Sequence, residues 1–495
     1  MSDYLCHIPC GESVPFDNPH AVSVSLPTLD DVIGYEEGDV AVVGKMKSGY
    51  PRFFRNKWVQ FLVDYVSKQY NIASDIVIFP ITSLKAYGVL SYLINDQLEY
   101  VEVDGNLFIL LNGDDVQLQQ IKDYIRNAGL IISSRQAEST LLKLGLLEES
   151  FVEDRVRFNN GYSAVVSVLS DAYNAKKENV ILTNSGANAF FAVCEALVSF
   201  EKSKEKNVVV QLGWLYVDTM EVIQKRSNQS YQQLNVHDLK QLDNWLNENH
   251  SNVSVIITEA VSNPKIQCVD IVALYAICEK YQVKLVLDTT LITPFNAPVL
   301  KYCDVAVESL SKFACGKGDV LMGAIIVSES SGLSQDFFED FVIPPHEGEV
   351  SRLGFEIADY EKRVLKSSEN TRKLIELLAQ KRGIKKVWSV LENTSSENYQ
   401  KLNNSGVIPG LLTIELDGYV ERYYDKLRTA KGPSLGTEFT LVMPYVYLAH
   451  YDLTKTEEGI KILNEKGMNP NILRISVGTE PIEDIVAVFN EVFAD

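Results

Sequence analysis

The sequence predicts an α/β protein with a mostly parallel sheet. Two apolar runs, LVLD at 285–288 and DVAVES at 304–309, are separated by a crossover that contains prolines. Near-continuous apolar runs of this kind are typical of parallel strands that are buried on both faces. A strand followed by a helix recurs at 178–197 and at 253–281, which is the alternation that builds such a sheet. Ligands of these folds bind outside the carboxyl ends of the strands.

The length and net charge of the chain limit the number of domains and the kinds of partner to expect. A chain of 495 residues is too long for one small core and favours two or three domains. The formal net charge of −20 argues against nucleic acid and anionic membranes as partners, because both require patches of Lys and Arg. The chain has no uninterrupted apolar segment of about 18 residues, so no membrane span is expected.

Cysteine and histidine usage narrows the chemistry. The seven cysteines are scattered without a C-x-x-C pair, which indicates reduced thiols. No signal-peptide pattern is visible at the N-terminus, so we expect a cytoplasmic protein. The six histidines are not in ligand spacing, and no metal site is expected.

Two residues at the strand ends suggest a cofactor. Asp288 ends the first apolar run, and Lys312 follows the second beside the glycine-flanked loop ACGKGD. An acid and an amine at one edge of a sheet suit pyridoxal phosphate, whose aldehyde condenses with a lysine while a carboxylate keeps its ring nitrogen protonated. The alternative is a lysine at a strand end that is simply solvated.

The sequence segments around these two residues resemble segments of a known protein family. SLSKFACGKGDVLMG and LDTTLITPFNAP are similar to segments of the Cys/Met-metabolism family of pyridoxal-phosphate enzymes, which includes cystathionine γ-synthase, cystathionine lyases and methionine γ-lyase. The resemblance covers 20–70 and 178–495 discontinuously, and the opening is closest to the longer fungal-type cystathionine γ-synthases. It implies the pyridoxal-phosphate-dependent transferase fold type I, with a mostly parallel seven-stranded sheet and a smaller C-terminal α+β domain.

From the resemblance and the composition we expect four segments. These are an N-terminal arm and helix at 1–73, an α/β insertion of unknown role at 74–178, a cofactor-binding large domain at 179–335, and a linking helix with a small domain at 336–495. In and next to the insertion, the sequence predicts a strand and helix at 73–94, a hairpin around Asp104-Gly105, and a helix at about 116–130.

The arm alternates apolar and polar residues and then turns acidic, so we expect no helix over 20–39. A tight turn at 49–51 leads into an amphipathic helix. Tyr50 and Arg52 match a family Tyr-x-Arg pair that clamps the cofactor phosphate of the neighbouring subunit, which implies a homodimer or homotetramer. An exposed arginine after a turn is the alternative, although a guanidinium is well shaped for phosphate.

A strand-to-helix junction at Ser185-Gly186-Ala187 matches the family's phosphate loop. A glycine at such a junction lets backbone N–H groups face an anion at the helix N-terminus. The resemblance implies that Gly186 and Ala187 are the backbone donors. It also implies that Ser309 and Ser311 provide phosphate-binding hydroxyls, two residues apart on one side of a strand end.

The segment LYVDT is similar to the family's L-Y-G-G-T, whose tyrosine stacks on the pyridine ring. Tyr216 takes that place, and its hydroxyl could exchange a proton with the substrate amine. Asp218 departs from the family pattern. It either lies in the substrate pocket, where it needs a cationic or donor partner, or caps a helix that starts near Thr219.

Three more residues match family positions. Asn263, in an E-x-x-x-N-P segment, would hydrogen-bond the 3-oxygen of the cofactor, although Asn-Pro alone is often only a turn. Ser434 in PSLG matches a serine that faces the substrate, and His450 matches a frequent noncatalytic histidine. Arg474 in LRISVG would hold the substrate α-carboxylate as a bidentate pair.

The predicted activity is a pyridoxal-phosphate-dependent γ-replacement on an O-acylhomoserine, with a thiol such as cysteine as acceptor. Lys312 would hold the cofactor and then serve as the base, which requires a desolvated, neutral amine. The main alternative is γ-elimination on a 4-substituted or sulfur-containing amino acid, as in methionine γ-lyase or a secondary-metabolite enzyme. A noncatalytic binding protein with this fold is a third possibility, which the intact Lys312, Asp288, Tyr216 and Arg474 argue against.

Overall fold

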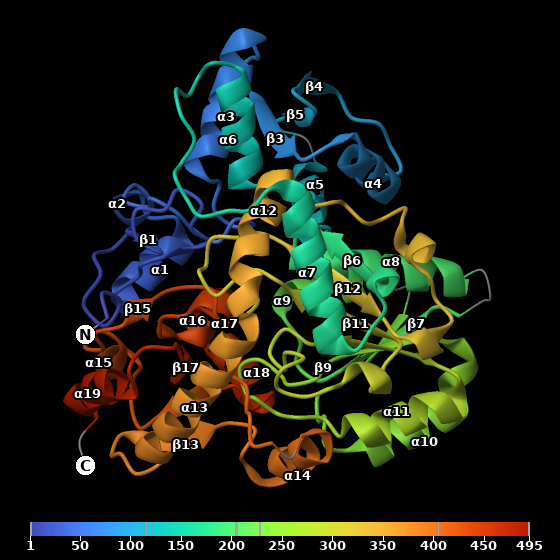
Figure 1. Ribbon diagram of the computed structural model, residues 1–495, viewed down its shortest axis with the longest axis vertical. Coiled ribbons are helices and arrows are strands. Elements are labelled where there is room, and N and C mark those ends of the chain that lie inside the picture. The colour runs from blue at the N-terminus through green and yellow to red at the C-terminus, as the bar shows by residue number, and fades with distance from the viewer. Residues whose placement is uncertain (1, 115, 203–205, 227–228, 404, 494–495) are drawn as a thin grey trace.

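A seven-stranded sheet forms the centre of the protein (Figure 1). The structure is a computed structural model and describes residues 2–114, 116–202, 206–226, 229–403 and 405–493. The strand order is β6-β12-β11-β10-β9-β7-β8, and β12 runs antiparallel to both of its neighbours while the other recorded pairs are parallel. The prediction of a mostly parallel seven-stranded sheet is therefore confirmed. The strands are β6 (Val180–Thr183), β7 (Val208–Leu212), β8 (Gln229–Gln233), β9 (Val253–Glu259), β10 (Lys284–Asp288), β11 (Val305–Ser309) and β12 (Gly323–Val327).

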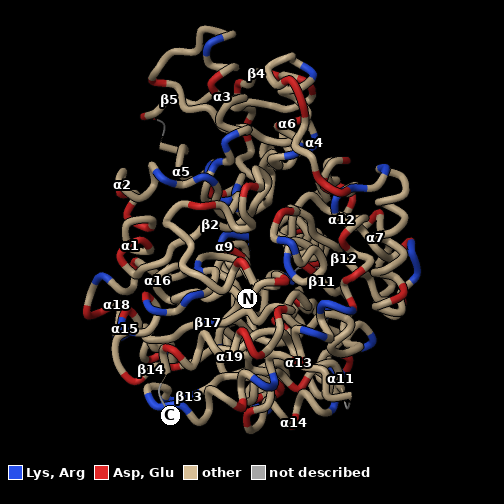
Figure 2. The backbone as a smooth tube through the Cα atoms, turned by 60° about the vertical axis from the view of Figure 1, so that its left-hand side comes forward, with Lys and Arg blue, Asp and Glu red and all other residues tan. Residues whose placement is uncertain are grey.

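Charged residues of both signs are interspersed along the chain (Figure 2). Within the described residues, no helix is long and apolar enough to cross a membrane, and no group of three or more His, Cys, Asp or Glu side chains could hold a metal ion. All seven cysteines are free thiols, and five of them are buried.

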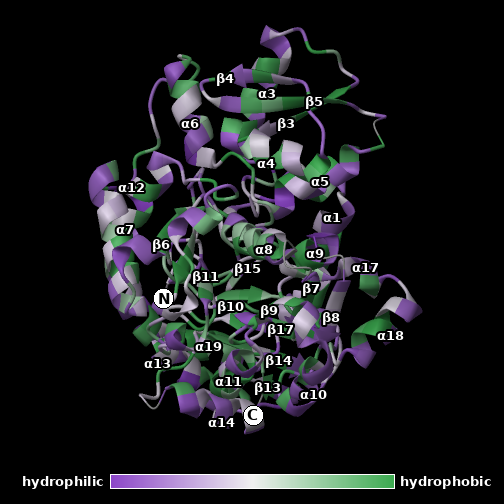
Figure 3. Cartoon of the chain, turned by 90° about the vertical axis from the view of Figure 1, so that its right-hand side faces the viewer, coloured by the Kyte–Doolittle hydropathy of each residue, from purple (hydrophilic) through white to green (hydrophobic). Residues whose placement is uncertain are grey.

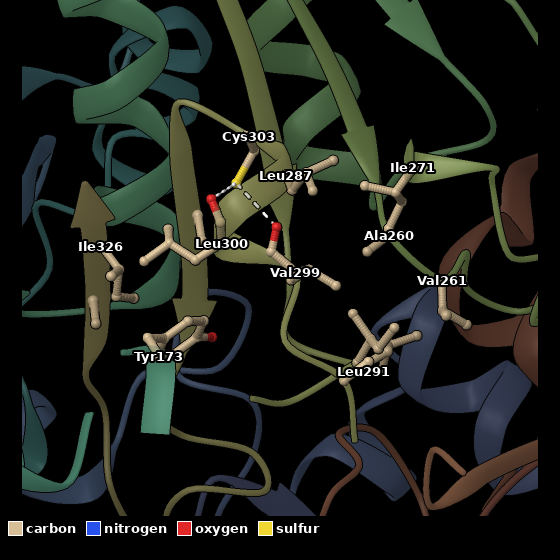
Figure 4. Close-up of a cluster of buried hydrophobic side chains, with 14 of the residues drawn as sticks. Tyr173, Ala260, Val261, Ile271, Leu287, Leu291, Val299, Leu300, Cys303 and Ile326 are labelled. Atoms are coloured by element: carbon tan, nitrogen blue, oxygen red, sulfur yellow. Dashed lines mark hydrogen bonds between the residues drawn. The ribbon is translucent and has the colours of Figure 1, made fainter. Parts of the chain in front are cut away.

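The sheet separates two hydrophobic cores. Along β10, Leu285 and Leu287 point into one core and Val286 into the other, because successive side chains of a strand face opposite sides. Figure 3 shows the central strands and helix α8 as the apolar interior of the domain. Figure 4 shows part of the first core, which includes Leu287, Ile271 and Cys303, with the thiol of Cys303 directed at the carbonyls of Val299 and Leu300.

Helices cover both faces of the sheet. Besides the strands, helices α7, α10, α11, α12, α13 and α14 (Asn393–Leu402) contribute buried residues to the first core, and α8, α9 and part of the insertion contribute them to the second. The bounds are α7 (Phe158–Tyr173), α8 (Gly186–Lys202), α9 (Val217–Arg226), α10 (Leu239–Asn249), α11 (Ile271–Tyr281), α12 (Glu347–Glu356) and α13 (Tyr360–Leu378).

The C-terminal domain is a smaller α+β unit, as the sequence predicts. Its five-stranded sheet has the order β13-β14-β17-β16-β15 and packs against α13 and α19. The strands are β13 (Ile384–Trp388), β14 (Leu411–Leu416), β15 (Ala430–Lys431), β16 (Leu441–Met443) and β17 (Ile472–Ser476). The further helices of this part are α14 (Asn393–Leu402), α15 (Glu421–Tyr424), α16 (Tyr445–Ala449), α17 (Tyr451–Thr454), α18 (Glu457–Glu465) and α19 (Ile482–Val492).

The arm contains a helix that the sequence analysis does not expect. Helix α1 (Leu29–Glu37) begins after Thr28, whose hydroxyl accepts from the N–H of Asp31 at 3.1 Å while the Asp31 carboxylate accepts from the N–H of Thr28 at 3.2 Å. This reciprocal capping box stabilises the first turn, and Gly38 in the left-handed conformation ends the helix. The prediction of no helix over 20–39 is therefore wrong. The other elements of the arm are β1 (Ser13–Val14), β2 (Ser23–Val24), α2 (Val40–Val43) and α3 (Lys57–Gln69).

The insertion forms a separate layer at the top of Figure 1. Its three-stranded antiparallel sheet has the order β3-β5-β4, and β4 and β5 form the hairpin expected around Asp104-Gly105. Helix α7 lies within the segment 74–178, yet its buried face packs in the first core of the large domain. The elements of the insertion are β3 (Ile76–Ile81), α4 (Leu84–Ile94), β4 (Tyr100–Val103), β5 (Asn106–Asn112), α5 (Leu118–Asn127) and α6 (Ser134–Lys143).

Candidate active site

A cavity of about 810 Å³ lies outside the carboxyl ends of β9, β10 and β11. Residues from the arm, the insertion, the large domain and the C-terminal domain line it. The structure brings together in this cavity every residue that the sequence analysis assigns to the site: Tyr50, Arg52, Gly186, Ala187, Tyr216, Asp218, Asn263, Asp288, Ser309, Ser311, Lys312, Ser434 and Arg474.

Lys312 lies in the turn after β11, and its side chain reaches across to the arm and the C-terminal domain. Its Nζ donates to the hydroxyl of Ser434 at 2.8 Å and to that of Tyr50 at 3.2 Å. Burial lowers the pKa of Lys312 below its ordinary value, although Tyr50 opposes the shift. The amine is therefore both oriented and biased toward its neutral, nucleophilic form.

Asp288 ends β10 at the floor of the cavity. Its carboxylate accepts from the N–H of Thr290 at 2.8 Å, and burial raises the pKa of Asp288. The hydroxyl of Thr290 in turn accepts from the N–H of Ser309 at 3.0 Å, so the ends of β10 and β11 are held together. A buried carboxylate in this position is suited to a cationic partner such as a protonated ring nitrogen.

The N-terminus of α8 forms another wall of the cavity. Helix α8 begins at Gly186, where a Cβ atom would lie 2.7 Å from the Cβ of Ser309, so only glycine allows this close approach. The hydroxyl of Ser311 donates to the carbonyl of Met322 at 3.3 Å and accepts from its N–H at 3.2 Å. Ser311 therefore ties the lysine turn to the start of β12 as well as lining the cavity.

Glu259 is a functional candidate that the sequence analysis misses. One oxygen of its carboxylate accepts from the N–H of Tyr216 at 2.6 Å, and the other accepts from the N–H of Asn263 at 2.9 Å. Burial, and then the neighbouring Asp288, raise the pKa of Glu259 well above its ordinary value. The sequence does mark this residue, because Glu259 is the first residue of the E-x-x-x-N-P segment that ends with Asn263-Pro264.

Arg474 on β17 is fully enclosed by the cavity wall. Its guanidinium donates to the carbonyl of Ser434 and, at 3.4 Å, to the side-chain oxygen of Asn263. The Nε is buried and has no hydrogen-bond partner in the part of the chain that the structure describes, and burial lowers the pKa of Arg474 to about 10. The ring of Tyr445, whose position gave no signal in the sequence, lies 5.6 Å from the guanidinium. An arginine with an unused donor is suited to bind a carboxylate.

Asp218 pairs with a protein cation. Helix α9 already begins at Val217, so Asp218 lies inside its first turn, and its carboxylate forms an ion pair with Arg52. The carboxylate oxygens have no hydrogen-bond partner within the described residues, so no capping hydrogen bond is present. The capping alternative is wrong because the helix starts two residues earlier than expected. A second cation, Arg126 of the insertion, lies 3.8 Å from the same carboxylate.

The structure places Tyr50 and Arg52 in the cavity of their own chain. Besides Asp218, Arg52 contacts the hydroxyl of Tyr216 in the same chain. The structure contains a single chain, so the expectation that this pair reaches a neighbouring subunit stays a prediction. Within the chain the arm is held on both sides: the N–H of Leu26 donates to the carbonyl of Lys431 at 3.0 Å, and α3 packs in the core of the insertion.

The donor set of the cavity fits pyridoxal phosphate. Backbone N–H groups at the start of α8, together with hydroxyls and a guanidinium, suit a phosphate. A buried carboxylate suits a protonated ring nitrogen, and a desolvated lysine suits an aldehyde. These groups are Gly186, Ala187, Ser309, Ser311, Arg52, Asp288 and Lys312.

The sequence could not reveal Arg126, which enters the cavity from the insertion. Its guanidinium lies 2.7 Å from the carboxylate of Glu221 and 5.5 Å from the ring centroid of Phe53. No motif in the sequence of α5 marks this position, because Glu221 and Phe53 are distant from Arg126 in sequence.

Comparisons with known proteins agree with this geometry. The family model described as Cys/Met metabolism PLP-dependent enzyme matches residues 156–494. The chain is 34% identical over 481 residues to L-2-amino-4-chloropent-4-enoate dechlorinase/desaturase of Streptantibioticus cattleyicolor, with 96% of each chain covered. It is 26% identical over 611 residues to cystathionine gamma-synthase of Neurospora crassa, with 97% of each chain covered.

Solved structures show the same fold. Cystathionine gamma synthase from Xanthomonas oryzae pv. oryzae, in complex with cystathionine, matches with a TM-score of 0.58 at 18% identity, over 70% of this chain and 88% of that chain. Cystathionine gamma-lyase from Lactobacillus plantarum, complexed with L-serine, matches with a TM-score of 0.57 at 17% identity, over 67% and 85% of the two chains.

Proposed function

The chain belongs to the Cys/Met metabolism family of PLP-dependent enzymes, and from that membership we propose that it removes a substituent from C4 of an L-α-amino acid by γ-elimination. The membership confirms the resemblance that the motifs indicate. The observation that carries the proposal is the buried amine of Lys312, held between Ser434 and Tyr50 beside Arg474. The relative that is 34% identical over nearly its whole length carries a name that describes loss of chlorine from C4 of an amino acid.

Arg474 orients the substrate. Its guanidinium binds the α-carboxylate, and Asn263 and the carbonyl of Ser434 fix the plane of the guanidinium. When bound, pyridoxal phosphate holds the substrate amine covalently and withdraws electrons from the Cα bond that breaks. Asp288 supports that withdrawal because its buried negative charge favours a protonated ring nitrogen.

Lys312 moves the protons. As a neutral amine it takes the proton from Cα, and Ser434 keeps its nitrogen in place during the transfer. A base then removes a proton from Cβ, and the substituent on C4 leaves with the electron pair of its bond to C4. Tyr50 is suited to share these protons. Although burial opposes the shift, the charges of Lys312 and Arg52 lower the pKa of Tyr50 to about 8.

The remaining wall suits an uncharged substrate side chain. The ion pair of Arg52 and Asp218 contributes no net charge, and the apolar side chains of Met443, Leu448 and Leu453 also line the cavity. A carbon-bound halogen or an acyl ester is uncharged before it leaves and needs no charged partner on this part of the wall.

γ-Replacement, the first choice of the sequence analysis, is the second candidate function. Full-length similarity to cystathionine gamma-synthase favours it. The cavity of about 810 Å³ also leaves space for a thiol beside an amino acid and the cofactor, since sites for ligands of drug size measure about 300–1,000 Å³.

Turnover with matched substrates distinguishes the two reactions. The purified holoenzyme is incubated with L-2-amino-4-chloropent-4-enoate, O-acetyl-L-homoserine or O-succinyl-L-homoserine, each with and without cysteine. Elimination predicts release of chloride or acid at a rate that cysteine does not change. Formation of cystathionine in proportion to cysteine would establish replacement instead, and no release from any of the three substrates would overturn the proposal.

A further inference from the structure

A tyrosine of the C-terminal domain lies beside the arginine that is assigned to the substrate. Tyr445 is the first residue of α16, and α16 packs next to β17, the strand that carries Arg474 (Figure 1). The centroid of the Tyr445 ring is 5.6 Å from the guanidinium of Arg474. At this distance the electron-rich face of a phenol ring attracts the cation, so the two side chains hold each other in place.

The hydroxyl of Tyr445 has no partner in the protein. The residue is only 2% exposed, yet it lines the active-site cavity. Within the described residues, no protein group forms a hydrogen bond with its hydroxyl. Buried phenols usually have a hydrogen-bond partner. We therefore expect the partner of Tyr445 among the groups that a bound ligand brings into the cavity.

Two further rings hold Tyr445 in its orientation. The ring of His450 lies edge-on to that of Tyr445 at 5.8 Å and to that of Trp214 at 5.1 Å. Trp214 comes from the large domain, two residues before Tyr216, and packs in the same small core as Tyr445. Burial lowers the pKa of His450 to about 4, so its imidazole is neutral at neutral pH. Because packing from both domains fixes the ring, the Tyr445 hydroxyl is held in place before a ligand binds.

A carboxylate on Arg474 needs more donors than the guanidinium supplies alone. Arg474 already donates to the carbonyl of Ser434 and to the side chain of Asn263. Each of the two oxygens of a carboxylate accepts about two hydrogen bonds, and a carboxylate that leaves water is costly unless donors replace the water. Burial raises the pKa of Tyr445 above its ordinary value, so its phenol keeps its proton and can donate it to such an oxygen.

We propose that Tyr445 is a substrate-binding residue whose hydroxyl donates a hydrogen bond to the α-carboxylate that Arg474 holds. The carboxylate is then recognised by one charged and one neutral donor. The inference rests on the role that the proposed function gives to Arg474. It applies to elimination and replacement alike, because the substrates of both reactions carry an α-carboxylate.

Binding of an amino acid without a leaving group tests the role of Tyr445. The holoenzyme is titrated with L-2-aminobutyrate, and the dissociation constant is read from the change in visible absorbance. Tyr445→Phe keeps the ring beside Arg474 and removes only the hydroxyl. It should weaken binding by about tenfold, the effect of losing one hydrogen bond to a charged group. Propan-1-amine has the same carbon chain without the carboxylate, and it should bind the wild type and Tyr445→Phe alike.

Two further variants keep the test specific. Tyr447→Phe removes a phenol from the same helix that packs on the core of the C-terminal domain, and it should bind L-2-aminobutyrate like the wild type. Arg474→Gln should weaken the binding of L-2-aminobutyrate more than Tyr445→Phe does. In turnover, Tyr445→Phe should raise KM and leave kcat nearly unchanged, because the carboxylate is bound equally in the ground state and the transition state.

The outcomes separate this inference from the proposed function. Wild-type affinity of Tyr445→Phe for L-2-aminobutyrate would overturn the role of Tyr445, and so would an equal weakening of propan-1-amine binding. Neither result affects the proposed function as long as Arg474→Gln weakens the binding of L-2-aminobutyrate. Unchanged binding in Arg474→Gln would instead overturn the assignment of Arg474, on which both proposals depend.

Discussion

The carboxylate of Asp218 and the guanidinium of Arg52 form an ion pair in which neither side chain is more than 5% exposed. The two carboxylate oxygens of Asp218 have no hydrogen-bond partner among the described residues. Charge therefore holds the pair together, with Arg126 as a second, more distant cation. Removing one partner of a buried pair typically costs about 3–5 kcal/mol, because the other charge is left uncompensated.

We expect Asp218→Asn to destabilise the apoenzyme more than the holoenzyme. Without the carboxylate, Arg52 is a buried cation, and the cofactor phosphate can compensate it only when bound. The measurement is thermal unfolding with and without saturating pyridoxal phosphate. Asp123→Asn, which removes a more exposed carboxylate near Arg126, is the control. Equal destabilisation of both forms would show that Arg52 does not turn from Asp218 to the phosphate.

The covalent link to the cofactor should form on Lys312. Lys317 lies in the same glycine-flanked loop, but its amine is 2.6 Å from the carboxylate of Glu438, and the pKa of Lys317 is raised although burial opposes the shift. It is therefore a charged and poor nucleophile. Borohydride reduction followed by peptide mapping should find the adduct on Lys312, and Lys312→Ala should lack turnover while still binding the cofactor. An adduct on Lys317 would refute the assignment.

The strand ends and most of the cavity could be predicted from the sequence, because both leave local signals. The apolar runs before Asp288 and Lys312 fix two parallel strands, and parallel strands bring their carboxyl ends to one edge. Similarity to family motifs assigns Asn263 and Arg474 to the site as well. Without that similarity, they would be interpreted as a turn residue and a surface residue.

Other features could not be predicted because they depend on contacts between distant segments. The ion pair between Arg52 and Asp218 depends on how the arm packs beside the large domain, which no local pattern encodes. Arg126 is an ordinary arginine in an amphipathic helix until α5 meets α9. Helix α1 is a different case: Thr28 and Asp31 form a recognisable capping box, which the alternation of the preceding residues obscured.

Glu308 should make the stability of the protein depend on pH. Its two carboxylate oxygens accept from the hydroxyls of Tyr173 at 2.7 Å and Tyr360 at 2.6 Å, yet burial raises the pKa of Glu308 to about 7 from an ordinary value of 4.5. Since the folded state binds the proton more tightly, the contribution of this group is fully present below pH 4.5 and is lost as the pH rises through 7.

Glu308→Gln should remove this pH dependence. The amide can still bond to both phenols but cannot ionise. Urea unfolding at pH 5 and pH 8 gives the free energy of unfolding for each protein, and the wild type should lose more stability than the variant over this range, at about 1.4 kcal/mol per unit of pKa shift as an upper bound. An identical loss in the two proteins would contradict the raised pKa.

The last prediction concerns Glu259, which we expect to position Tyr216 and Asn263 rather than to react. Its two carboxylate oxygens each accept a backbone N–H, one from each of these residues. A glutamine has a single oxygen, so in Glu259→Gln its NH₂ group must face one of the two N–H groups and leave a buried donor unsatisfied, at a cost of about 1–3 kcal/mol. Because Tyr216 and Asn263 both line the cavity, the displaced backbone should lower kcat/KM by about 10- to 100-fold and shift the visible absorbance of the bound cofactor.

Glu308→Gln is the matched control, since Glu308 is an equally buried carboxyl close to Asp288 whose bonds lead away from the cavity. Should both variants lose activity alike, the effect would come from the loss of negative charge near Asp288, and the positioning role of Glu259 would be refuted.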